Sequence, residues 1–196
     1  MVQHNFGYET AGSSYYSIGD CIRGSVFTIP EAGTADSITA CLYALGNTSQ
    51  PTKCAIYLHS DLSLKGTTEQ RTIAYTTTST WQTFNFAEPK PSLTTTTAYV
   101  LVAWADVTDY GPSLRYNAGD ANQEHHQNIA YGGFPDPLAP THGNSKYSIY
   151  CTYTVAGGGV TVKKGSNLAN TMTEMLNSKL LFSACNRFPK LTTRRF

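Results

Sequence analysis

The densest group of side chains that could do chemistry lies in the stretch "NAGDANQEHHQ", residues 117–127. Asp120, Asn122 and Glu124 are spaced like the oxygen ligands of a hard cation such as calcium. The stretch lacks the full EF-hand pattern, and loops rich in Asp, Asn and Gly more often form turns. A structural calcium ion is therefore one alternative and an ordinary turn the other; no other cofactor or metal is expected.

Two histidines, His125 and His126, follow these oxygen-bearing residues directly. On a strand, neighbouring side chains point to opposite faces of the sheet. The two imidazoles therefore cannot chelate one zinc ion together. We expect one of them to be a partly buried histidine with its hydrogen bonds satisfied.

The region from residue 106 to 145 also holds aromatic side chains among Gly, Pro, Asn and His. Aromatic faces beside hydrogen-bonding groups suit a sugar or a protein partner. The alternative is an ordered loop whose aromatic side chains plug an open end of the fold. The predicted binding residues are Tyr110, Tyr116, Asp120, Asn122, Glu124, His125, Tyr131 and Phe134.

Catalytic motifs are missing from the sequence. It contains no G-x-S-x-G nucleophile motif, and "VAGGGVTVKKGS" does not have the spacing of a phosphate-binding loop. Cys151 lies in the middle of an expected strand without a neighbouring base. The carboxylates cannot be paired at a defined separation, so a non-catalytic role is expected rather than an enzyme.

The composition points to a surface protein. Only 14% of the 196 residues are charged, well below the average of about 25%, and the net charge is +1. We therefore expect no nucleic-acid or membrane partner. The amino terminus shows no Sec signal peptide, and the longest apolar run, at 99–105, has the length of a strand. These features predict a location on a virion or another extracellular surface.

Nine short stretches with strand character alternate with turn signals, from "CIRGSVFTI" to "KYSIYCTYTV". They predict an all-β fold of two packed antiparallel sheets. Within 38–45, small and branched apolar residues alternate with Thr39, Cys41 and Tyr43, so one face is expected in the core and the other partly covered. In "AYVLVAWADV", Trp104 shares a face with Val100 and Val102, and we expect it between the sheets.

Five cysteines occur, and an odd number leaves at least one unpaired. Most are expected to be reduced thiols in the core. Cys41 and Cys54 are the best candidates for a disulfide, because they lie on successive strands that could pair.

Five stretches in chain order carry a resemblance to a known architecture: "RGSVFTIPEAGTADSITACLY", "KCAIYLHSDLSLKG", "WQTFNF", "TTTTAYVLVAWAD" and "LRYNAGD". They resemble the jelly-roll β-sandwich accessory domains of carbohydrate-active enzymes, surface adhesins and phage tail or virion proteins, over residues 5–155. In carbohydrate-binding members, exposed aromatic residues stack on sugars and a structural calcium often lies near a sheet edge. No motif here assigns either feature to particular residues, so the resemblance implies only the fold and the broad role.

The segment after the strands has a different character. Gly157, Gly158 and Gly159 form a joint between an expected sandwich, residues 1–156, and a C-terminal helix and tail, residues 157–196. The helix carries one apolar stripe, which either packs on its own sandwich or contacts the same element of neighbouring subunits. The predicted assembly residues are Leu168, Met172, Met175, Leu176 and Leu180 in the helix and Phe188, Leu191 and Phe196 in the tail.

These features predict a structural protein of a virion surface, such as a capsid decoration or tail-appendage subunit. It would form a homo-oligomer through its C-terminal arm and contact other virion proteins. The alternatives are a carbohydrate-binding module or adhesin domain that binds glycans, and an extracellular filament subunit.

Overall fold

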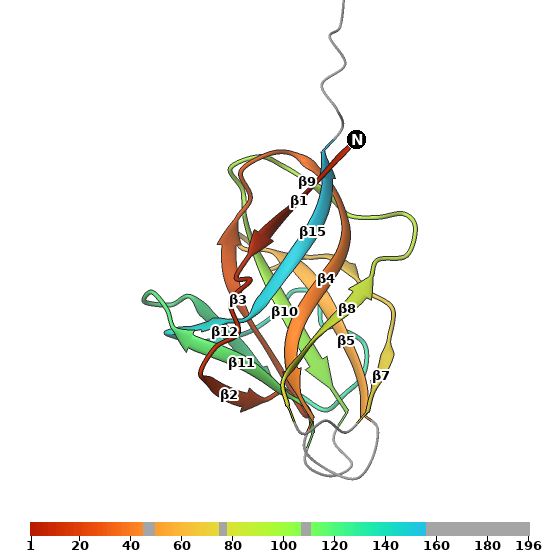
Figure 1. Ribbon diagram of the computed structural model, residues 1–196. Coiled ribbons are helices and arrows are strands. Elements are labelled where there is room, and N and C mark those ends of the chain that lie inside the picture. The colour runs from red at the N-terminus through yellow and green to blue at the C-terminus, as the bar shows by residue number, and fades with distance from the viewer. Residues whose placement is uncertain (45–49, 75–77, 107–110, 156–196) are drawn as a thin grey trace, which may run out of the picture. The chain divides into compact units, whose positions relative to one another are not determined.

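The computed structural model describes residues 1–44, 50–74, 78–106 and 111–155, which are folded into strands (Figure 1). In chain order the strands are β1 Val2–Gly7, β2 Ser14–Ser17, β3 Cys21–Thr28, β4 Gly33–Tyr43, β5 Gln50–Leu58, β6 Leu64–Thr67, β7 Arg71–Ile73, β8 Thr80–Asn85, β9 Ser92–Leu93, β10 Ala98–Ala105, β11 Ser113–Ala118, β12 Glu124–Asn128, β13 Thr141–Gly143, β14 Ser145–Tyr147 and β15 Ile149–Val155. None of the described residues forms a helix long and apolar enough to cross a membrane. The predicted C-terminal helix and tail, with every predicted assembly residue, lie outside this part.

The strands form two antiparallel sheets, as the sequence predicts. Sheet A has eight strands in the order β1-β15-β4-β11-β14, with β2 on β11 and with β8 and β9 on β4. Sheet B has seven strands in the order β13-β12-β3-β10-β5-β6, with β7 on β5. The first and last described strands are neighbours, and Val2 of β1 pairs with Val155 of β15.

The core between the sheets is built from alternate residues of the central strands. Ile38 and Leu42 of β4 in sheet A belong to the same buried cluster as Leu101 of β10 in sheet B. The alternation in β4 therefore divides a core face from an outer face, as its sequence pattern predicts.

A second buried cluster covers the outer face of sheet B. It contains Val100, Val102 and Trp104 of β10, together with the partly buried Tyr131 and Phe134. The indole of Trp104 is fully buried, which confirms its predicted burial. The prediction that it lies between the sheets is wrong, because the other set of β10 side chains, which includes Leu101, faces the core.

The cover over this face is the loop 129–139, which follows β12. Main-chain N–H groups anchor it: Tyr131 N donates to the side-chain Oδ1 of Asp20 at 2.9 Å, and Leu138 N donates to the Leu62 carbonyl at 3.0 Å. The Lys53 ammonium lies 5.0 Å from the centre of the Trp104 ring and donates a hydrogen bond to the Gly132 carbonyl. Cation–π contact and burial together make this loop a fixed part of the fold.

The predicted disulfide between Cys41 and Cys54 does not form. Cys41 lies on β4 of sheet A and Cys54 on β5 of sheet B, so these successive strands do not pair. Both thiols are free and buried, as are Cys21 and Cys151. The expectation of reduced thiols is confirmed for these four described cysteines.

Candidate functional site

The polar stretch 117–127 divides into a turn and a strand. Asp120 and Asn122 are exposed in the turn between β11 and β12. The Asp120 main-chain N–H donates to Gln123 Oε1 at 3.0 Å, and Asn122 N–H donates to Asn144 Oδ1 at 3.2 Å. Among the described residues, no three His, Cys, Asp or Glu side chains are placed to hold a metal ion. The positions of Asp120 and Asn122 agree with the alternative that this stretch forms an ordinary turn.

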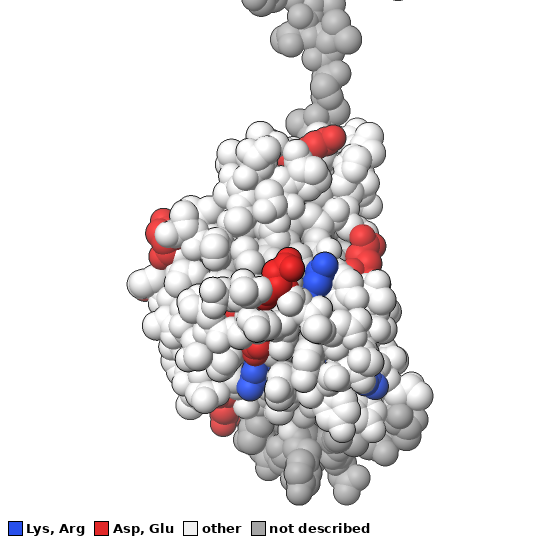
Figure 2. Space-filling view, turned by 90° about the vertical axis from the view of Figure 1, so that its left-hand side faces the viewer, with Lys and Arg blue, Asp and Glu red and all other residues white. Residues whose placement is uncertain are grey.

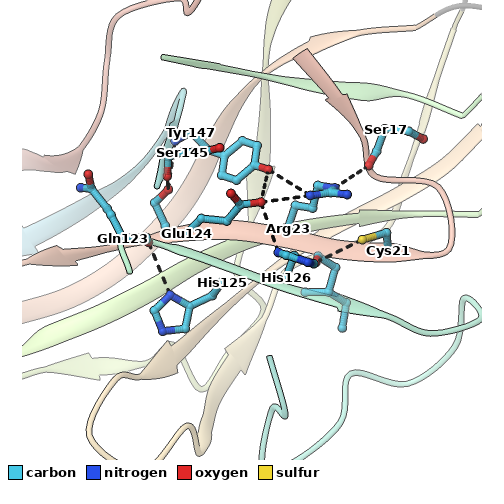
Figure 3. Close-up of polar contacts among 11 residues, drawn as sticks. Ser17, Cys21, Arg23, Gln123, Glu124, His125, His126, Ser145 and Tyr147 are labelled. Atoms are coloured by element: carbon cyan, nitrogen blue, oxygen red, sulfur yellow. Dashed lines mark hydrogen bonds and ion pairs between the residues drawn. The ribbon is translucent and has the colours of Figure 1, made fainter. Parts of the chain in front are cut away.

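Glu124 lies in a buried cluster with Arg23, His126 and Tyr147, which we call the inter-sheet polar cluster (Figure 3). Its Oε1 atom is 3.0 Å from Arg23 Nη1 and 3.3 Å from His126 Nδ1. The Tyr147 hydroxyl donates to the same oxygen at 2.8 Å. Only 7% of the Glu124 side chain is exposed, so this carboxylate is not open to a ligand.

Protonation of this cluster follows from its partners. Burial acts to raise the pKa of Glu124, but hydrogen bonds from Tyr147 and Ser145 and the charges of His126 and Arg23 outweigh it and lower the pKa. Burial raises the pKa of Tyr147. At neutral pH the cluster therefore holds a carboxylate and a neutral phenol.

The same cluster joins the two sheets. Tyr147 comes from β14 of sheet A, whereas Glu124 comes from β12 of sheet B. Ser25 of β3 adds a second connection, because its hydroxyl donates to Ser145 O at 3.0 Å and accepts from Tyr147 N at 2.9 Å. We therefore assign these residues to the stability of the fold rather than to binding.

His125 points to the opposite face of β12 from His126, as the sequence predicts. It is fully buried, 5.2 Å from the His59 ring and 4.5 Å from the His142 ring between centroids. Its Nδ1 is 3.4 Å from Gln123 O, and its Nε2 has no hydrogen-bond partner in the described part of the chain. His125 is therefore not the partly buried, satisfied histidine that the sequence predicts for one member of this pair. Burial lowers its pKa to about 4.

The predicted aromatic residues do not form one surface. Tyr116 lies on β11 of sheet A and stacks on Tyr16 with ring centroids 4.7 Å apart. Tyr131 and Phe134 contact Trp104 over sheet B, with centroids 5.1 and 5.2 Å from the indole. Tyr110 is outside the described residues. The arrangement of Tyr131 and Phe134 agrees with a structural role, although they cover a sheet face rather than plug an end.

An aromatic surface that the sequence did not reveal lies on the outer face of sheet A, where β15, β4 and β8 run across the front of Figure 1. Trp81 of β8 pairs with Cys41 of β4, and Tyr150 of β15 pairs with Thr39 of β4. The two rings meet with centroids 5.5 Å apart. Trp81 is 37% exposed, which is a large fraction for an indole on a sheet.

A second aromatic pair lies on the same face, toward β2. The rings of Tyr15 on β2 and Tyr43 on β4 are 5.7 Å apart, and Tyr15 is 49% exposed. The guanidinium carbon of Arg115, on β11 between these strands, is 5.4 Å from the Tyr15 ring and 5.6 Å from the Tyr43 ring. We call Tyr15, Tyr43, Trp81, Arg115 and Tyr150 the aromatic face.

Short uncharged side chains accompany the aromatic face. Thr39 and Thr83 share a hydrogen bond of 2.9 Å, and Thr152 donates to Asn5 Oδ1 at 2.8 Å. Figure 2 shows the flank of the molecule on which β2 and β11 lie, where charged side chains are few and scattered. Thr39 is buried, so the exposed Thr83 and Asn5 and the half-buried Thr152 supply the hydroxyl and amide groups beside the exposed rings. In the sequence, the alternation of Thr39, Cys41 and Tyr43 predicted a partly covered outer face on this strand but did not place aromatic residues of other strands beside it.

Comparison with known proteins adds information on the fold alone. No protein-family model matches the sequence, and no curated protein matches it. One similar solved structure is the clostridial cysteine protease Cwp84 after propeptide cleavage, with a TM-score of 0.50 and 15% sequence identity. The similarity covers 78% of this chain and 40% of that chain, so this protein spans less than half the length of its structural neighbour.

Proposed function

We propose that the protein is a non-catalytic carbohydrate-binding module of a surface protein, and that its ligand lies on the aromatic face. Two ring pairs on this face carry this proposal, the exposed Trp81 with the half-buried Tyr150 and the exposed Tyr15 with the half-buried Tyr43. A pyranose ring has apolar C–H faces and a rim of hydroxyl groups. Exposed aromatic side chains suit the C–H faces, and neighbouring Thr and Asn side chains suit the hydroxyl groups.

We also propose that the β-sandwich is a jelly-roll accessory domain, as the resemblance in the sequence implies. The two antiparallel sheets support it, because one outer face is covered by the loop 129–139 while the other carries exposed rings. A covered face and an open face give the module one side for binding. Display on a virion through the C-terminal arm remains a prediction from the sequence and is compatible with this role.

The test is binding to a glycan array, followed by calorimetry with the best glycan. We expect Trp81→Ala and Tyr15→Ala each to weaken binding about tenfold or more, which corresponds to about 1.4 kcal/mol. Tyr16→Ala is the matched control: Tyr16 is 44% exposed and follows Tyr15 on β2, but it stacks on Tyr116 instead of joining the aromatic face. The affinity of the Tyr16→Ala variant for the glycan should equal that of the unaltered protein.

Two results would contradict the proposal. One is an array on which the unaltered protein binds no glycan. The other is a self-associated protein that Trp81→Ala converts to a monomer, because the aromatic face would then be an interface between copies of the chain.

A further inference from the structure

Arg115 places a positive charge inside the aromatic face. Its guanidinium lies beside the Tyr15 and Tyr43 rings, on β11. The described neighbours of Arg115 in the strand register are neutral: Arg115 pairs with Tyr15 on β2, and Ser113 pairs with Ser17 on β2 and with Tyr43 on β4. A ligand on this face would therefore meet a cation flanked by two phenol rings.

The partners of Arg115 are neutral as well. Its Nε donates to Ser79 Oγ at 2.5 Å, and its Nη1 donates to the Ser13 carbonyl at 3.3 Å. A guanidinium has five N–H donors, and within the described part of the chain most of the donors on its two terminal nitrogens have no acceptor. The ion pairs between described residues do not include Arg115, whereas the partly buried Arg23 pairs with Glu124.

We infer that the ligand is an acidic glycan whose anionic group binds Arg115 while its sugar rings contact the neighbouring tyrosines. An arginine fork matches the two oxygens of a carboxylate, and it also binds the oxygens of a sulfate ester. The shared chemistry is an oxyanion attached to a pyranose. Since the ligand lies on the aromatic face, this inference rests on the proposed function and names its substrate class.

The experiment compares four probes by calorimetry: an oligogalacturonide, the same oligosaccharide with its carboxyl groups reduced to alcohols, sialyllactose and a sulfated oligosaccharide. We expect the unaltered protein to bind at least one acidic probe tenfold or more tighter than the carboxyl-reduced probe. The affinity should fall as salt rises, because exposed charges are screened. The carboxylate and sulfate probes show which anion is preferred.

Variants then assign the effect to one side chain. Arg115→Gln should remove the preference for the acidic probe and the salt dependence of binding. Arg115→Lys should keep part of the preference, since it keeps the charge but not the fork. Arg71→Gln is the matched control, because Arg71 is exposed and donates to the Thr83 carbonyl at the β8 side of sheet A.

The outcomes test the preference for acidic glycans separately from glycan binding itself. Equal affinity of the unaltered protein for the acidic and carboxyl-reduced probes would overturn the acidic preference and leave the proposed function standing, and this comparison needs no variant to fold. An equal loss in Arg71→Gln would also overturn it, because the effect would then be general electrostatics. Failure to bind any glycan would contradict the proposed function itself.

Discussion

The Tyr147 hydroxyl donates a hydrogen bond of 2.8 Å to Glu124 Oε1 and thereby joins β14 of sheet A to β12 of sheet B. Arg23 donates to both groups, to Glu124 Oε1 at 3.0 Å and to the Tyr147 oxygen at 3.2 Å. The three side chains therefore form a closed triangle of polar contacts between the sheets. Loss of one member leaves the other two in place but incompletely paired.

Tyr147→Phe should lower the free energy of unfolding by about 1–3 kcal/mol, because the buried carboxylate loses a donor that water cannot replace. Chemical denaturation measures this change. Tyr15→Phe is the control: Tyr15 is 49% exposed, and its loss of a hydroxyl should change stability by less than about 0.5 kcal/mol. Equal stabilities of Tyr147→Phe and the unaltered protein would show that the hydrogen bond has no net value.

Trp104→Ala should cost about 3–5 kcal/mol, the usual range for truncation of a buried tryptophan. The indole is fully buried, and the Lys53 ammonium and the loop 129–139 lose their contacts with it. In a Trp81→Phe background, Trp104 should emit at short wavelength and resist quenching by iodide. Red-shifted and readily quenched emission would mean that the loop does not cover sheet B in solution.

Stability should fall in mild acid because of His125. Its folded pKa is about 4, below the unperturbed value of about 6.5, so the unfolded chain binds the additional proton between these values. This contribution to stability is complete above pH 6.5 and is lost progressively toward pH 4. The full loss is roughly 3 kcal/mol, at about 1.4 kcal/mol per pH unit.

The variant His125→Phe tests whether His125 causes this loss, and the free energy of unfolding is measured by denaturation at several pH values. The variant should lose most of the dependence of the free energy of unfolding on pH between 6.5 and 4, whatever its stability at pH 7. His142→Asn, at the exposed neighbour whose ring is 4.5 Å away, should keep most of it. A slope that is unchanged in His125→Phe would assign the acid sensitivity to other groups.

Assembly is predicted from the sequence after residue 156, which lies outside the described part. We expect the full chain to form a homo-oligomer, because an apolar helical stripe and a tail with Phe188 and Phe196 follow a glycine joint. Residues 1–156 should stay folded and associate less. Light scattering at micromolar concentration measures both masses, and equal monomeric masses would refute the prediction.

Strand periodicity predicted the two-sheet architecture well because most strands have one apolar face. It failed at β10, where "YVLVAWA" is apolar at every position and both faces are covered. A continuous apolar run does not show which face meets the other sheet. Trp104 was therefore assigned to the wrong face. The Cys41–Cys54 prediction failed for a related reason, because neighbours in the sequence are not always neighbours in a sheet.

The candidate site was harder to predict than the fold. Tyr15, Trp81 and Tyr150 are far apart in the sequence, and only the register of β2, β8 and β15 with their partner strands brings them to one face. The stretch 117–127 attracted attention because its polar residues are adjacent in sequence. Folding separates them: Asp120 lies in a turn, and Glu124 and His125 point to opposite sides of β12.

The pairing of Val2 with Val155 determines how the β-sandwich should respond to mechanical load. Force applied between these two ends pulls on the first pair of an antiparallel ladder, so the β1–β15 hydrogen bonds break one after another, as in a zipper. Force applied between the aromatic face and Val155 instead slides β15 along β4, and the bonds from Ile149 to Thr154 resist together. A β-sandwich held at Val155 and loaded at the aromatic face would therefore resist a pull that would open it if applied between Val2 and Val155.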